Sequence, residues 1–159
     1  MIDHGNLWAR ECQSETAYRY SSSIYPIRHD HYGMPGAPRF ALYPESGLGL
    51  LELPETTVGL FNRNLPAGAG YLRLLPYSVS RWCLKRVNTF DQQPCIFYFR
   101  PWEIDPGQPR QSGINLKTRF RHDVSLSAME ARIRALFRDF QWDRVDRLFL
   151  TANDEPTHD

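Results

Sequence analysis

The chain has 159 residues, of which 42% are hydrophobic and 13% are aromatic. This composition supports a single domain with its own core and excludes an intrinsically disordered chain. The 19 basic residues nearly balance the 18 acidic ones, so the formal net charge is +1 and bulk charge does not favour nucleic-acid binding. No apolar run approaches the about 20 residues of a membrane span, and the first residues do not resemble a signal peptide. We therefore expect a cytoplasmic protein without a membrane span.

The first half of the chain contains short apolar segments separated by turns. Residues 7–17 predict a short helix, and the aromatic-rich residues 18–25 predict a strand that ends at Pro26. Residues 26–44 carry four prolines, which predicts a long structured loop. A second strand is expected over residues 48–54, a short extended piece around residues 57–58, and a glycine-containing turn over residues 64–71.

The second half of the chain carries two clear helical patterns. The first helix is predicted from Ser78 or Ser80 to about residue 88, and residues 95–99 predict a strand buried on both faces. The second helix is expected to open with a capping box formed by Ser127 and Glu130. Its predicted exposed pair is Glu130 with Arg134, and its predicted buried residues are Met129, Ile133, Leu136, Phe137 and Phe140. A short amphipathic segment over residues 145–150 follows, and the irregular alternation of helices and strands favours an α/β fold.

Histidines next to aspartates raise the question of a metal site. His29, Asp30 and His31 follow the first predicted strand, and His122 precedes Asp123 further along the chain. Two histidines and one aspartate can bind zinc. However, neighbouring residues on an extended chain point to opposite faces, and no third ligand is identified. The pattern favours a loop pinned by hydrogen bonds from His29 and Asp30 over a metal site.

The most distinctive string is RPWEIDP, at residues 100–106, which directly follows the apolar run 95–99. Side chains at the carboxyl ends of parallel strands often form binding sites. Trp102 next to Glu103 and Asp105 fits a sugar, with an aromatic platform and carboxylates for hydroxyl groups. A rigid turn bracketed by prolines, with Trp102 half in the core, explains the string equally well. Residues 21–23 lack the glycines of a nucleophile elbow, so covalent serine catalysis is not expected.

Taken in order, several strings resemble one family, the NodB-type polysaccharide deacetylases. The closest resemblance is to the subgroup associated with exosortase and exopolysaccharide loci. The strings are YSSSIYP (20–26), HDHYGMP (29–35), APRF (37–40), LELP (51–54), GAGYLRLLPY (68–77), PWEIDP (101–106) and FRH (120–122). The resemblance covers residues 18–150, with a poorly matched segment over residues 1–17 and a flexible tail over residues 151–159. It implies the C-terminal portion of a distorted β/α barrel with a C-terminal helical extension.

The resemblance also implies a reaction, the hydrolysis of N-acetyl groups on an exopolysaccharide. Family members use a divalent metal such as zinc, an aspartate base and a histidine acid. The metal and base motifs belong to an N-terminal half that this sequence lacks, so no metal ligand is expected in it. Arg100 stands at the expected position of the acid histidine, and an arginine keeps its proton at any working pH.

Two functions follow from this comparison. The first is a truncated deacetylase homologue that is inactive on its own. The alternative is a non-catalytic module that binds glycan or complements a separately encoded N-terminal half. Candidate substrate-groove residues are Ser22, Ser23, His29, Asp30, Trp102 and Glu103. Half a barrel would leave strand edges uncovered, so self-association is a further expectation.

Overall fold

The computed structural model describes residues 1–3, 5–29, 33–44, 49–61, 63–108, 113 and 124–150. These residues form helices and short strands, so the α/β class is confirmed at the level of mixed structure. The helices are α1 (Ala9–Glu15), α2 (Ala69–Leu74), α3 (Tyr77–Arg86), α5 (Leu126–Asp139) and α6 (Val145–Phe149). A π-turn, η1 (Val87–Asp91), extends α3, and a 3-10 helix, η2 (Pro101–Ile104), lies between α3 and α5. The strands are β1 (Tyr20–Ser21), β2 (Leu51–Glu52), β3 (Thr57–Leu60) and β4 (Arg63–Pro66).

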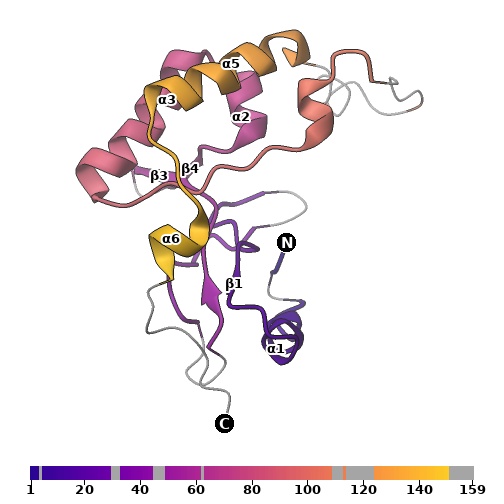
Figure 1. The fold of residues 1–159 in the computed structure, drawn as a ribbon, viewed down its shortest axis with the longest axis vertical. Helices are drawn as coiled ribbons and strands as arrows, with labels where there is room; N and C mark the ends of the chain where they lie inside the picture. The colour runs from indigo at the N-terminus through magenta and orange to yellow at the C-terminus, as the bar shows by residue number, and fades with distance from the viewer. Residues whose placement is uncertain are drawn as a thin grey trace.

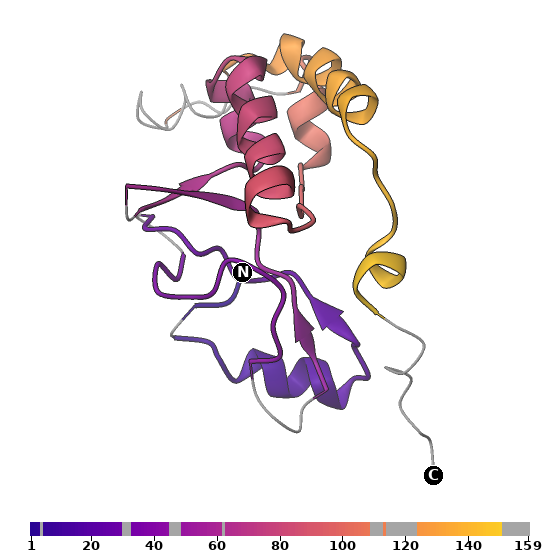
Figure 2. The ribbon, with the colours of Figure 1, turned by 90° about the vertical axis from the view of Figure 1, so that its left-hand side faces the viewer.

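The elements fall into a helical end and a loop-rich end. Helices α2, α3 and α5 lie together at one end of the molecule, next to the β3–β4 hairpin (Figure 1). Helix α1 and strands β1 and β2 lie at the opposite end (Figure 2). The chain that leaves α5 runs along the side of the molecule to α6. None of the helices in the described ranges is long and apolar enough to cross a bilayer.

Each end contains one two-stranded sheet. Strand β1 pairs in parallel with β2, with Tyr20 opposite Leu51 and Ser21 opposite Glu52. Strands β3 and β4 form an antiparallel hairpin. The described residues therefore contain two-stranded sheets and no closed barrel, and the barrel inferred from the resemblance stays a prediction.

The main core lies between helices α2, α3 and α5 and the β3–β4 hairpin. Helix α5 contributes one face to this core because its apolar side chains recur every three or four residues. The buried members of the core are Val58, Ala67, Leu72, Cys83, Leu84, Val87, Met129, Ile133 and Leu136. Three of these, Met129, Ile133 and Leu136, match the face that the sequence predicts for α5, and the Glu130–Arg134 ion pair is confirmed at 2.7 Å.

Two details of α5 differ from the sequence prediction. The helix begins at Leu126, two residues earlier than expected, and its N-cap residue is Ser125 with a positive φ of 52° and no side-chain cap bond. The predicted capping box at Ser127 is therefore wrong. Phe137 is 59% exposed because its position on the helix points away from the core and toward the ring of Trp142. The centroids of these two rings lie 5.8 Å apart.

The segment predicted as a doubly buried strand is extended but is not part of a sheet. Residues 95–99 are half-buried or exposed. The Thr56 backbone nitrogen donates to the Ile96 carbonyl oxygen at 3.3 Å, and the Ile96 nitrogen donates to Thr56 Oγ1 at 2.7 Å. In the described part of the chain, residues 95–99 belong to neither of the two sheets. A strand assignment fails here because the sheet that would cover this segment is not present in the described residues.

The segment predicted as a turn over residues 64–71 contains regular structure. Its first part belongs to β4 and its last part begins α2. The turn was predicted because Gly68 and Gly70 lie in this segment and glycine is common in turns. Gly68 instead precedes α2 and lies against aromatic rings, where an added Cβ would come 3.1 Å from Tyr98 Cε1.

A glycine in the proline-rich loop offers the first testable prediction. Gly33 has a φ of +107°, and a Cβ added there would lie 2.3 Å from the carbonyl oxygen of Ile27. Gly33→Ala should lower the free energy of unfolding by about 2–3 kcal/mol, because both the backbone conformation and the space exclude a side chain. The matched control is Gly36→Ala, because nothing lies within 4 Å of a Cβ at Gly36. Urea denaturation of both variants gives the comparison, and equal stabilities would contradict it.

Candidate functional site

The turn that follows residues 95–99 is fixed by one buried carboxylate. Glu103 is buried, and its Oε2 accepts a hydrogen bond from the Arg100 backbone nitrogen at 2.8 Å. Its Oε1 accepts a bond from Arg73 Nε at 3.1 Å, which forms a buried ion pair between α2 and η2. The Glu103 nitrogen donates in turn to the Arg100 carbonyl oxygen at 2.9 Å. The conformation at Arg100 is therefore set by Glu103 and by Pro101, which restricts its own φ.

Two further contacts fix the position of the Arg73 side chain and backbone. The Arg73 guanidinium carbon lies 4.9 Å from the ring centroid of Trp102, which is a cation–π contact. Arg132 of α5 donates through Nη1 to the carbonyl oxygens of Leu72 at 2.5 Å and of Arg73 at 2.9 Å. These bonds satisfy backbone acceptors at the end of α2 and connect it to α5.

A second buried carboxylate, Glu55, lies in the linker between β2 and β3. Glu55 is 6% exposed, and its Oε2 has no hydrogen-bond partner. Burial raises the pKa of the Glu55 carboxyl to about 7, while the charges of Arg100 and of the amino terminus and a hydrogen bond from Tyr98 act in the opposite direction. Glu55 therefore exchanges a proton near neutral pH.

Two tyrosines, Tyr98 and Tyr25, interact with Glu55. The pKa of Tyr25 is raised far above its usual value, first by burial and then by the charge of Glu55. Tyr98 and Tyr71 also act electrostatically on Tyr25, and the Gly68 backbone forms a hydrogen bond with it. The loop after β1, the β2–β3 linker, the start of α2 and residues 95–100 thus meet in one polar cluster. We call Glu55, Tyr25, Tyr98 and Arg100 the Glu55 cluster.

The candidate serines hold the loop after β1 in place. Ser22 Oγ donates to the Leu53 carbonyl oxygen at 2.7 Å. The Ser23 and Ile24 nitrogens donate to Glu52 Oε1 at 2.7 and 2.8 Å, and Ser23 Oγ donates to Glu52 Oε2 at 3.0 Å. Glu52 is completely buried, so its charge is stabilised by these three donors. Both serines thus bind the strand β2 and its end.

The remaining candidate groove residues lie in the proline-rich loop and at η2. His29 is half-buried in the proline-rich loop, and Asp30 lies outside the described residues. Trp102 is half-buried, and both oxygens of Glu103 form hydrogen bonds inside the protein. The structure brings Trp102 and Glu103 together at η2, and it places Ser22 and Ser23 together next to β2. Their role in a substrate groove stays a prediction.

A divalent metal needs several ligating side chains close together. In the part of the chain that the structure describes, no three histidine, cysteine, aspartate or glutamate side chains come together as a ligand set. The described residues therefore do not fit the metal that the resemblance implies. The cysteines Cys12, Cys83 and Cys95 are free thiols.

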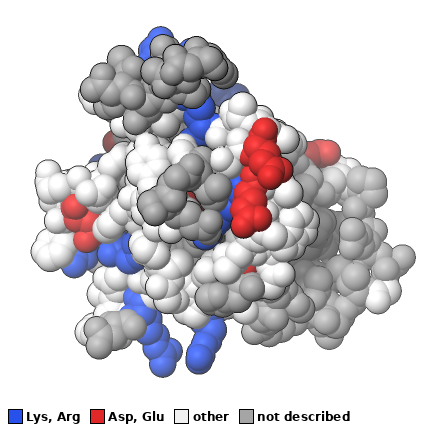
Figure 3. Space-filling model, turned by 90° about the horizontal axis from the view of Figure 1, so that it is seen from below, with Lys and Arg blue, Asp and Glu red and all other residues white. Residues whose placement is uncertain are grey.

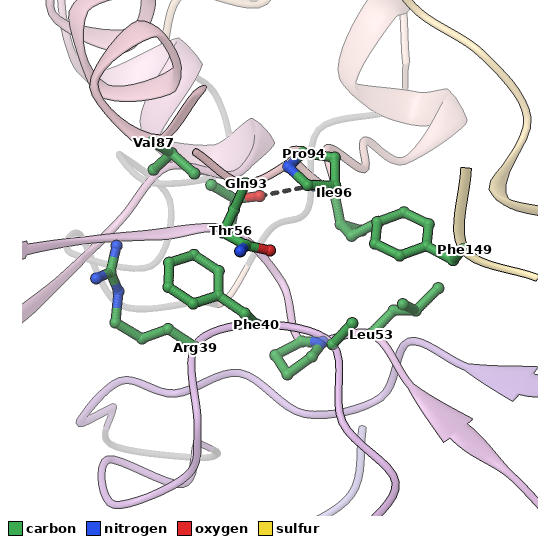
Figure 4. A pocket seen from close by; sticks show the side chains of 11 residues that line it. Arg39, Phe40, Leu53, Thr56, Val87, Gln93, Pro94, Ile96 and Phe149 are labelled. Carbon is green, nitrogen blue, oxygen red and sulfur yellow. Dashed lines mark hydrogen bonds between the residues drawn. The ribbon is translucent and has the colours of Figure 1, made fainter. Parts of the chain in front are cut away.

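Two hollows lie near residues 93–97. The smaller one, about 10 Å³, lies between Phe40, Leu53, Thr56, Ile96 and Phe149 (Figure 4). That volume holds at most one water molecule, so this hollow is not a ligand site. The larger one is a groove of about 760 Å³, a size typical of small-molecule sites. We call it the α3 groove. It is lined by Arg81, Leu84, Lys85, Asn88, Thr89, Pro94 to Phe97, Asp139 to Asp143, Val145, Leu148 and Phe149.

Sequence reasoning missed the residues that organise the site. Glu55 stands within an apolar stretch, residues 50–58, which is the one local signal for a buried carboxylate with a special environment. Nothing local to Tyr25 or Arg73 signals a role, because the side-chain partners Glu55 of Tyr25 and Glu103 of Arg73 each lie 30 residues away in the sequence. On the face of the molecule seen from below, the described residues show small groups of both charge signs (Figure 3).

Comparison with known families gave one match. A family model described as "Domain of unknown function (DUF3473)" matches residues 22–150. No curated protein and no solved structure matches the chain. The matched range contains the Glu55 cluster, the η2 turn and the α3 groove, so these three features belong to the region that defines the family.

Proposed function

Because the chain belongs to the DUF3473 family, which is associated with the C-terminal regions of polysaccharide deacetylases, we propose that it is a non-hydrolytic homologue of that enzyme class. Its proposed role is to bind an acetylated exopolysaccharide, the substrate of a metal-dependent N-deacetylase. The resemblance of residues 18–150 to NodB-type deacetylases supports this class of ligand.

The observation that carries the proposal is the environment of Arg100. The resemblance puts a proton-transferring histidine at this position, whereas an arginine side chain stays protonated. Glu103 and Pro101 hold the backbone of Arg100 in one conformation, so the position is built but carries a fixed positive charge. The side chain at this position therefore binds acceptor groups and does not move protons.

A deacetylation assay tests this function. The protein is incubated with N-acetylated oligosaccharides and added zinc or cobalt, and released acetate is measured. We expect no release above the level without protein, and an active deacetylase run in parallel shows that the assay works. Metal-dependent turnover by this chain would contradict the proposal.

A binding role without hydrolysis needs a site for the glycan, and the α3 groove is the candidate. Trp142 is 37% exposed and lies edge-to-face with Phe97 and Phe140, at centroid distances of 6.2 and 6.4 Å. Aromatic rings beside the polar groups of Asn88 and Thr89 fit the apolar and hydroxyl-bearing surfaces of a sugar ring.

Replacement of the groove tryptophan distinguishes this candidate. Trp142→Ala should reduce binding of N-acetylated oligosaccharides at least about tenfold, because aromatic anchors dominate such sites. The matched control is Trp82→Ala, which removes a tryptophan of α3 that is 48% exposed and does not line the groove. Calorimetric titration measures both, after circular dichroism has shown that both variants are folded. Equal affinities for the two variants would contradict a site in the groove.

The complementing role predicts association with another polypeptide or with a second copy. Residues 95–99 are extended and half-buried or exposed, and they belong to neither sheet of the described residues. Such an edge is a template for pairing with another strand. We expect sedimentation analysis to show self-association that weakens on adding a separately encoded N-terminal half. A clean monomer with cooperative unfolding would contradict this expectation.

A further inference from the structure

The α3 groove contains one cation that pairs with no carboxylate of the described residues. The charged side chains that line the groove are Arg81, Lys85, Asp139 and Asp143. Arg81 Nε lies 2.8 Å from Asp139 Oδ2. Asp143 Oδ1 lies 3.5 Å from Arg147 Nη1, so three of the four charges are paired inside the protein. Lys85 is exposed, and none of the ion pairs within 4 Å in the described ranges involves it.

Two polar side chains that line the groove beside Lys85 offer oxygen acceptors. Asn88 Nδ2 donates to the Gln93 carbonyl oxygen at 2.8 Å and lies 3.6 Å from Cys95 Sγ. Thr89 Oγ1 donates to the Lys85 carbonyl oxygen at 2.8 Å. These hydrogens are used inside the protein, whereas the side-chain oxygens of Asn88 and Thr89 have lone pairs that can accept further bonds. This part of the groove is therefore complementary to a ligand with hydroxyl donors.

Aromatic rings supply the apolar part of the groove. Trp142 lies edge-to-face with Phe97 and Phe140, which also line it. The indole nitrogen of Trp142 donates to the Leu136 carbonyl oxygen at 3.1 Å. Trp142 thus offers ring carbon atoms to a ligand, and such atoms suit the C–H face of a sugar.

We propose that the α3 groove binds a uronic acid unit of a glycan and that Lys85 contacts its carboxylate. This inference rests on the proposed function, because it names the kind of sugar that the groove takes.

A uronic acid matches all three parts of the groove. It has hydroxyl groups for the two oxygen acceptors, a C–H face for Trp142 and a carboxylate for Lys85. A charge-assisted hydrogen bond is about twice as strong as one between neutral groups, so the groove favours the acidic sugar over its neutral counterpart. Free acetate has the charge but lacks the ring and the hydroxyl groups.

The experiment compares two tetrasaccharides that differ only in their carboxylates. The full chain is titrated by calorimetry with a hyaluronan tetrasaccharide, in which glucuronic acid alternates with N-acetylglucosamine, and with its carboxyl-reduced form, which has glucose in place of glucuronic acid. The acidic form should bind about tenfold more tightly, as one charge-assisted hydrogen bond allows. Acetate should bind more weakly than either tetrasaccharide.

The outcomes separate this inference from the proposed function. Equal affinities for the two tetrasaccharides, or tighter binding of the neutral form, would overturn the inference and leave glycan binding intact. Acetate that binds as tightly as the acidic tetrasaccharide would overturn the assignment of a sugar. Absence of binding by both tetrasaccharides would contradict the proposed function as well.

Variants at neighbouring positions of α3 identify the cation. Lys85→Gln should remove the preference for the acidic tetrasaccharide, whereas Lys85→Arg should keep it because the charge is kept. Arg86→Gln is the matched control, because it removes the same charge from the next residue, whose guanidinium lies over the Phe90 ring and does not line the groove. Circular dichroism shows whether each variant is folded. A preference that survives in Lys85→Gln, or that is lost in Arg86→Gln, would overturn the proposal.

Discussion

Replacing Glu103 by alanine should lower the free energy of unfolding by about 3–5 kcal/mol, because it leaves a buried charge without its counter-ion. Arg73 and Glu103 are both buried, and the carboxylate of Glu103 also accepts a hydrogen bond from the Arg100 backbone nitrogen at 2.8 Å. The substitution removes the ion pair and frees a backbone donor at the same time. Urea denaturation at pH 7 measures the loss.

A double variant shows that the loss comes from the unpaired charge. Arg73→Met combined with Glu103→Leu replaces both charges by apolar side chains of similar size, and such replacements are often neutral or stabilising. The double variant should therefore be more stable than Glu103→Ala alone. A loss below about 1 kcal/mol for Glu103→Ala would show that the ion pair is solvated rather than buried.

Replacing Glu55 by glutamine should stabilise the protein at pH 8 and leave its stability nearly unchanged at pH 4. The folded pKa of Glu55 is about 7, above its ordinary value of 4.5. The folded state thus binds the proton more tightly than the unfolded state, and ionisation destabilises the fold as pH rises from about 4.5 to about 7. The gain at pH 8 is at most about 3 kcal/mol, from 1.36 kcal/mol for each pKa unit.

The measurement is the difference in unfolding free energy between wild type and variant across pH 4 to 8. Glu15→Gln provides the control, because Glu15 is an exposed residue at the end of α1. The Glu55→Gln difference should rise through the neutral range and then level off, while the Glu15→Gln difference should stay flat over the same range. A flat Glu55→Gln difference would show that Glu55 is ionised at pH 5 in the folded protein.

Sequence periodicity predicted the elements whose structure depends on near neighbours. Met129, Ile133 and Leu136 recur at helical spacing, and all three are buried in the core as expected. The exposed Glu130–Arg134 pair follows from the same spacing. Helix α1 lies within the short helix predicted over residues 7–17, and α6 lies within the amphipathic segment predicted over residues 145–150. These features need only contacts three or four residues apart, so they can be read from local pattern.

The parts that failed depend on what covers a segment from outside. Residues 95–99 have the composition of a buried strand, yet they are half-buried or exposed and belong to neither sheet of the described residues. Phe137 fits an apolar stripe by spacing, yet its ring lies 5.8 Å from Trp142 at the surface. Spacing gives the face on which a side chain lies, and the tertiary structure decides whether another element covers that face.

The sequence by itself determined the mixed helix-and-strand class of the fold and the buried face of its longest helix, and it singled out the string at residues 100–106 as distinctive. The tertiary structure alone decided how the charges of that region are arranged. Glu103 pairs with Arg73 across 30 residues, and Glu52 accepts bonds from Ser23 across 29 residues. Glu55 meets Arg100 and Tyr98 in the same way. A buried charge is stable only where other segments supply its hydrogen-bond or ion-pair partners. Short-range sequence patterns do not predict which distant segments come into contact.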